Sequence, residues 1–124
     1  MNYRNYEEFS DEMCRKLGKL KIQEVKIERL EMSGFISGKR AIYAKQVAMF
    51  DFTLCEAKGL AVLNLFDKTA VAMSDAKRLM DGILISAFEL DGNSVVYEIA
   101  KNRYNTTLTR VETLLESRNS GEIN

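Results

Sequence analysis

"VVYEIAKNRYNTTLTRVETLLESR", residues 95–118, carries the signals that decide the fold expected for this chain of 124 residues. Val96 and Ala100 lie one helical turn apart and predict the inner face of a helix that ends near Tyr104. Asn105 tolerates a left-handed backbone and suits a tight turn. A second apolar stripe then follows at helical spacing, in Leu108, Val111, Leu114 and Leu115. Two helices joined by a short turn predict a helix-turn-helix.

The segment before this stretch, residues 74–90, is also expected to be a helix. Ser74 and Asp75 are good N-cap residues, and Gly92 suits the left-handed position that follows a helix. Together with residues 95–118 this helix would complete a trihelical unit over residues 74–118. The residues that follow, 119–124, are polar and are expected to form a frayed tail.

The first 73 residues are expected to combine one helix with a small sheet. A helix over residues 6–20 follows from an apolar stripe, with Gly18 as its stop; the stripe consists of Tyr6, Phe9, Met13 and Leu17. Near-alternation over residues 20–32 predicts a strand with a bulge, although the same residues also fit a helical pattern. The two glycines within residues 33–39 predict a turn.

Two further strands are expected over residues 50–55 and 60–67, joined as a hairpin by the short loop at residues 57–59. The fold class expected for the whole chain is therefore α+β. It would comprise an N-terminal helix, an antiparallel sheet of about three strands and the C-terminal helix-turn-helix-like unit, packed as one compact domain.

The amino-acid composition excludes several classes of function. The chain has 18 basic and 18 acidic residues, and no His. Histidine-dependent catalysis and His-ligated metals are excluded, and neither a cofactor nor a metal is expected.

Cys14 and Cys55 form no metal-binding or redox motif and predict reduced thiols in a cytoplasmic protein. No apolar run suggests a signal peptide or a membrane span. No enzymatic motif is present, so a non-enzymatic regulatory protein is expected.

The string "YEIAKNRYNTTLTRVE", residues 97–112, resembles the DNA-binding effector domain of the sporulation master regulator of Firmicutes. The resemblance rests on Ile99-Ala100-Lys101, Asn105-Thr106-Thr107 and Thr109-Arg110-Val111-Glu112. It implies a DNA-binding transcriptional regulator with double-stranded DNA as its partner. The residues expected at the DNA interface are Lys101, Arg103, Thr106, Thr107, Thr109, Arg110 and Thr113.

Two departures from that family leave an alternative open. Thr113 and Glu116 stand where the family's recognition helix continues with basic residues, and zero net charge disfavours a strong DNA binder. The alternative is a protein-binding adaptor, or a phage or mobile-element inhibitor that no longer reads DNA. A homodimer, built partly on residues 1–73, is a further expectation.

Overall fold

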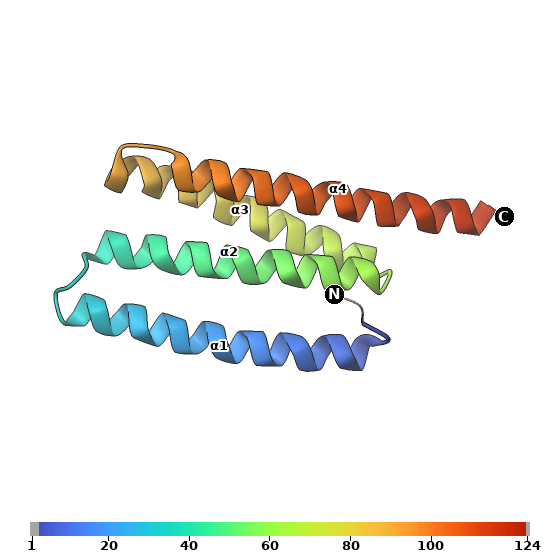
Figure 1. The fold of residues 1–124 in the computed structure, drawn as a ribbon, viewed down its shortest axis with the longest axis horizontal. Helices are drawn as coiled ribbons and strands as arrows, with labels where there is room; N and C mark the ends of the chain where they lie inside the picture. Colours follow the sequence, from blue (N-terminus) through green and yellow to red (C-terminus); the bar gives the residue numbers. More distant parts are fainter. Residues whose placement is uncertain (1–2, 124) are drawn as a thin grey trace.

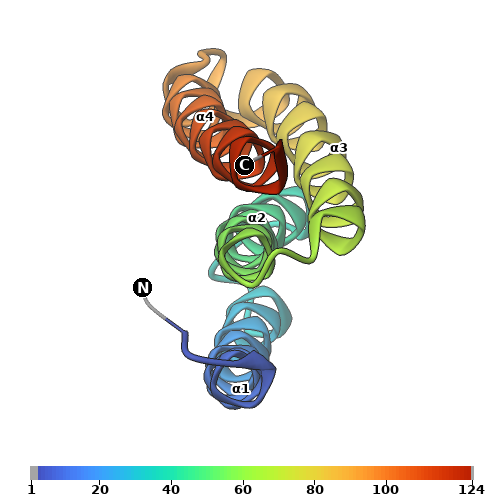
Figure 2. The same cartoon turned by 90° about the vertical axis from the view of Figure 1, so that its right-hand side faces the viewer.

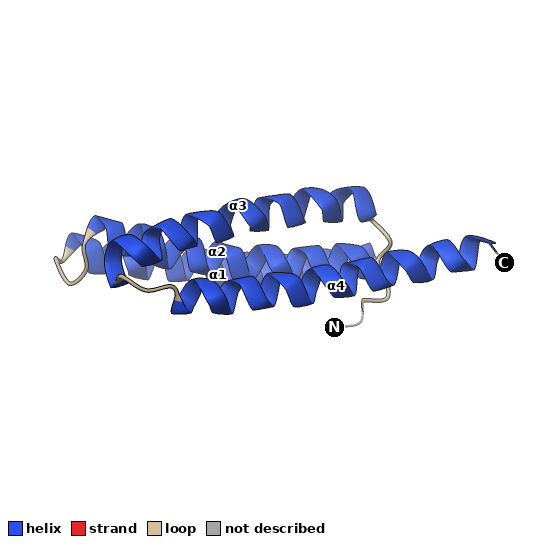
Figure 3. Cartoon of the chain, turned by 90° about the horizontal axis from the view of Figure 1, so that it is seen from above, coloured by secondary structure: helices blue, strands red, loops and turns tan. Residues whose placement is uncertain are grey.

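Four long antiparallel helices make up the structure, a computed structural model that describes residues 3–123 and the side chains up to residue 119. They are α1 (Tyr6–Met32), α2 (Gly38–Val62), α3 (Phe66–Asp91) and α4 (Val95–Ile123). The chain runs up and down through short turns, so that consecutive helices are neighbours (Figure 1). Figure 3 shows helices and loops and no strand within the described residues.

The expected α+β fold is therefore wrong, and the chain is all-α. Residues 20–32 belong to α1, which agrees with the helical pattern noted as the alternative to a strand in that segment. Residues 50–55 lie within α2, and residues 60–67 contain the end of α2, a short turn and the start of α3. Within residues 3–73, the structure contains neither a sheet nor a β-hairpin.

The central helix is α2, which packs against all three other helices (Figure 2). The α1 helix packs along its length against α2 and meets α3 where the Lys68 ammonium lies over the Tyr6 ring. The most extensive contact joins α2 to α3. Small side chains allow this close approach, since the alanines on the facing sides of the two helices are almost completely buried. They are Ala57, Ala61, Ala72, Ala76 and Ala87.

The α1 helix is held to α2 by one stripe of buried apolar side chains. Phe9, Met13, Leu20 and Ile27 are spaced by four and seven residues, which keeps them on one face of the helix. The α1 helix begins at a cap where the Asn5 side chain accepts a hydrogen bond from the Glu8 backbone N–H. Gly18, the expected stop, lies inside α1, and a Cβ added there would have nothing within 4 Å.

The turn after α1 and the end of α3 agree with the sequence-based prediction, whereas the predicted start of α3 does not. Residues 33–37 form the turn expected between Ser33 and Lys39, and Gly34 adopts a φ of 80°. Gly92 adopts the predicted left-handed conformation with a φ of 63° at the C-terminus of α3. In contrast, Ser74 and Asp75 do not cap a helix, because α3 begins eight residues before Ser74, at Phe66.

Candidate functional site

The α4 helix carries all the residues expected at the DNA interface, but it is not a helix-turn-helix. Residues 95–123 form one uninterrupted helix, and Asn105 lies inside it rather than in a turn. Thr106, which was expected to cap a second helix, lies inside this one, and its hydroxyl donates a hydrogen bond to the Asn102 carbonyl four residues earlier. The Asn93 side chain, just before the helix, accepts a hydrogen bond from the Val95 backbone N–H.

The continuous helix distributes the predicted residues over different surroundings. Arg103, Thr106, Arg110 and Thr113 are spaced by three and four residues, and therefore share one face of α4. Lys101 and Thr109 are exposed elsewhere on the helix. Thr107 is 1% exposed, and its hydroxyl donates to the Arg103 carbonyl, so it does not lie on a surface that a DNA duplex could reach.

The face that carries Arg103 and Arg110 borders α2. Two cavities lie along this border, and both are lined by Lys58 of α2. The smaller has a volume of about 200 Å³ and is lined by Cys55, Asn102 and Arg103 among others. Arg103 also forms an ion pair with Asp51, which neutralises its charge at this position.

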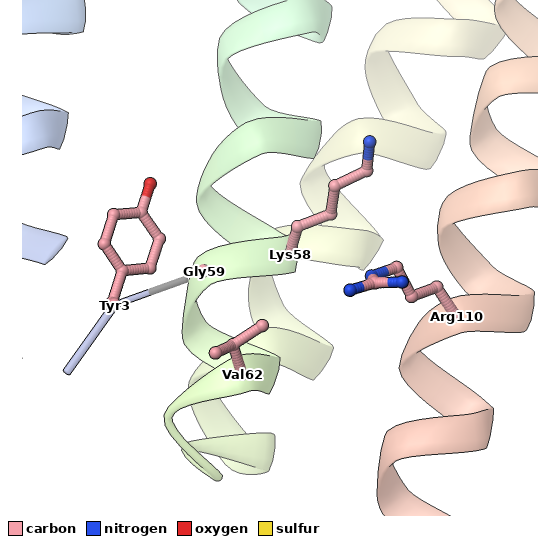
Figure 4. Close-up of a pocket in the computed structure, with 5 residues that line it drawn as sticks. All are labelled: Tyr3, Lys58, Gly59, Val62 and Arg110. Carbon is pink, nitrogen blue, oxygen red and sulfur yellow. The ribbon is translucent and has the colours of Figure 1, made fainter. Parts of the chain in front are cut away.

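The larger cavity has a volume of about 380 Å³ and is lined by Tyr3, Lys58, Gly59, Val62 and Arg110. We call it the Lys58–Arg110 cleft. In Figure 4 the Arg110 side chain extends from α4 towards α2, and Tyr3 lies on the opposite side of α2. Lys58, Gly59 and Val62 of α2 form the floor between them.

The Lys58–Arg110 cleft is lined by two cations and by no carboxylate of a described residue. Among the described residues, neither Lys58 nor Arg110 forms an ion pair, whereas eight other basic side chains do. Three lysines are partly buried, at positions 16, 45 and 58. Lys16 and Lys45 each pair with a glutamate, which leaves Lys58 as the partly buried lysine without an acidic partner in the described part of the chain.

Tyr3 reaches the cleft because the segment before α1 folds back against α2. Its ring packs edge-on against Phe9, with 5.3 Å between the ring centroids. Burial raises the pKa of the Tyr3 phenol, and the carboxylate of Glu12 raises it further. The phenol therefore stays protonated at neutral pH and remains a hydrogen-bond donor.

Sequence reasoning identified Arg110 but missed Lys58 and Tyr3. Lys58 is separated from Arg110 by 52 positions (110 minus 58) and stands in a segment that was expected to form a hairpin loop. Only the packing of α2 against α4 brings the two side chains together. No local motif marks Lys58, because a lysine in an ordinary helical context is usually a solvated surface residue.

Other features of the described residues add no second kind of site. No group of three or more Cys, Asp or Glu side chains is arranged to hold a metal ion within residues 3–119. None of the helices is long and apolar enough, over the described residues, to cross a membrane. Searches against protein-family models, curated proteins and solved structures found no match to this chain. The resemblance of residues 97–112 to the sporulation regulator therefore stays a prediction.

Proposed function

We propose that this chain is a non-enzymatic protein-binding module that docks through the turn between α1 and α2. The observation that supports the proposal is the exposure of two large apolar side chains at this turn. Met32 is 86% exposed and Phe35 is 80% exposed. Such side chains cost free energy in water, so a pair at the tip of a helical hairpin is typical of an interaction site.

The charge around this turn is mainly basic, because the exposed Arg29 and Lys39 outnumber the exposed Glu31. Arg29 and Lys39 flank Met32 and Phe35, and neither basic side chain forms an ion pair with a described residue. An apolar pocket rimmed by carboxylates would bury Met32 and Phe35 while pairing the two cations. We therefore expect a partner protein with an acidic rim around an apolar pocket.

The test compares two variants that each place a charge on an exposed apolar side chain. Phe35→Asp alters the turn, and Val71→Asp is the matched control, because Val71 is 63% exposed on α3. Tagged proteins are used to capture partners from the source cells, with Arg29→Glu as a third variant. We expect one partner to be retained by Val71→Asp, lost with Phe35→Asp and weakened with Arg29→Glu.

Two results would contradict this proposal. A partner set that is identical for Phe35→Asp and Val71→Asp would show that the turn is not the interface. Sedimentation showing a wild-type dimer that Phe35→Asp converts to a monomer would assign the turn to self-association instead.

A second candidate function is binding to double-stranded DNA. It is supported by Arg110, which is exposed on α4 and lines the same cleft as Lys58 of α2. Non-specific affinity for duplex DNA is typically about 1–100 μM at physiological salt. Fluorescence anisotropy with a random duplex at low salt should then give a Kd below about 100 μM, weakened by Arg110→Gln. Lys77→Gln is the control, because Lys77 is exposed on α3 and lies outside the set of residues expected to contact DNA. Weaker binding of the wild type would exclude this candidate.

A further inference from the structure

We propose that the Lys58–Arg110 cleft binds the phosphate group of a small phosphate monoester. This site is independent of the turn between α1 and α2, which lies at the opposite end of α2 (Figure 1).

The charge of the cleft favours a dianion. Lys58 and Arg110 come from two different helices and line the same space, and neither is paired with a carboxylate of a described residue. A phosphate monoester carries a charge of about −1.5 to −2 at neutral pH, which matches two cations. The Arg110 guanidinium can bond two phosphate oxygens at once, and the Lys58 ammonium can contact the third.

A second large cleft in the same protein provides a contrast. It has a volume of about 440 Å³ and is lined by Arg40, Asp51 and Asp91 among others. There Arg40 pairs with Asp91 at 2.8 Å, and Asp51 pairs with Arg103. The charges in that cleft are satisfied within the protein, whereas the charges of Lys58 and Arg110 are available to a ligand.

The shape of the cleft favours a small molecule over a polymer. Its volume of about 380 Å³ falls within the range of about 300–1,000 Å³ that is usual for small-molecule sites. Tyr3 forms one wall, and with Val62 it offers apolar surface to the organic part of a monoester (Figure 4). Tight binding of a duplex needs a row of phosphate contacts, and the cleft supplies two cations in a chain of zero net charge.

The test uses isothermal titration calorimetry on the full chain with three probes: inorganic phosphate, AMP and adenosine. We expect saturable binding of phosphate and of AMP, with a Kd for AMP below about 1 mM. Adenosine should not bind measurably, because it lacks the phosphate group. A random DNA duplex forms a fourth arm, and it should compete with AMP poorly.

Four variants locate the binding. Lys58→Gln and Arg110→Gln should each weaken AMP binding at least about tenfold, because each removes a charge-assisted hydrogen bond. Lys58→Arg should keep most of the affinity. Lys77→Gln removes one positive charge from an exposed position on α3, and should leave AMP binding unchanged. Circular dichroism of each variant checks that the four helices still form.

Two outcomes would overturn the proposal. One is a titration in which neither phosphate nor AMP approaches saturation at about 10 mM, a concentration at which any useful site would be filled. The other is AMP binding to folded Lys58→Gln and Arg110→Gln that equals the binding to wild type. Equal weakening by Lys77→Gln would likewise point to general charge attraction instead of a site.

Discussion

Replacing Gly59 by Ala should destabilise the protein, although the same change elsewhere in a helix stabilises it. Gly59 lies in α2 where α1 and the N-terminal segment press against it. A Cβ at this position would lie 2.5 Å from Cδ2 of Phe9 and 3.0 Å from the Tyr3 ring. The Phe9 ring cannot simply rotate away, because it is 4% exposed and packs against Tyr3.

The matched control is Gly18→Ala in α1. A Cβ there meets no atom within 4 Å, so this variant reports the intrinsic helix preference of Ala over Gly, which is about 1 kcal/mol. Gly59→Ala gains the same preference but adds an overpacking cost of about 1–3 kcal/mol. The free energies of unfolding of the two variants should therefore differ by about 1–3 kcal/mol.

Urea unfolding followed by circular dichroism measures both free energies, and the slopes of the transitions should be equal. Adding Phe9→Leu to Gly59→Ala should recover part of the loss if the Phe9 ring causes it, and this double-mutant cycle isolates the contact. A Gly59→Ala protein as stable as Gly18→Ala would refute the close approach of α1 to α2 at this position.

Three further substitutions have defined outcomes. Tyr43→Phe should raise the free energy of unfolding by about 1 kcal/mol, because the buried Tyr43 hydroxyl has no hydrogen-bond partner among the described residues. Burial, and then the charge of Asp91, raise the pKa of Tyr43, so ionisation of its phenol disfavours folding. Wild type should therefore lose more stability than Tyr43→Phe as the pH rises beyond about 10, which urea unfolding at pH 7 and pH 11 will show. Burial, and then the charge of Asp75, raise the pKa of Glu56, so its ionised form disfavours folding at pH 7. Glu56→Gln should therefore raise the free energy of unfolding at pH 7 and lose this gain as the pH falls to about 4. A gain that persists at about pH 4 would contradict the raised pKa of Glu56. Gly92→Ala should lower the free energy of unfolding by about 1 kcal/mol, because Gly92 has a φ of 63°, and an unchanged thermal midpoint would count against that conformation.

Part of the fold was predictable because its signals are local. The start of α1 at Tyr6, a helix within residues 74–90 and the left-handed Gly92 are confirmed. The turn predicted over residues 33–39 is confirmed for residues 33–37, since α2 begins at Gly38. Each depends on a cap, a glycine or an apolar stripe within a few residues. These are features that a sequence displays without knowledge of its neighbours in space.

The sheet was predicted wrongly because α2 is surrounded. A helix with three neighbours buries side chains in almost every direction, so its apolar residues no longer fall on one face. Phe50 and Leu54 are buried and Phe52 is partly buried, and their alternation with Asp51 and Thr53 imitates a strand. The length of the apolar region, from residue 41 to residue 63, favours a helix over several short strands.

Only one side of the candidate site, the side formed by α4, was predictable from the sequence. Arg110 stood out because it lies in the string that resembles the sporulation regulator, whereas Lys58 and Tyr3 become relevant through packing between distant segments. Thr107 shows the opposite error, since a residue expected to contact DNA is buried against the bundle. Helix faces are defined by neighbouring helices, which single-sequence periodicity does not identify.

The attachment of α1 mainly to α2 has a consequence for hydrogen exchange. Because α1 packs along its length against α2 and meets α3 through the Lys68 ammonium over the Tyr6 ring, it can separate while α2, α3 and α4 remain packed. Its amide protons should then exchange through a partial opening of lower free energy. Tyr3 and Phe9 would leave with it, and the Lys58–Arg110 cleft would lose a wall. A ligand bound in that cleft should therefore slow amide exchange along α1, including turns that the ligand never touches.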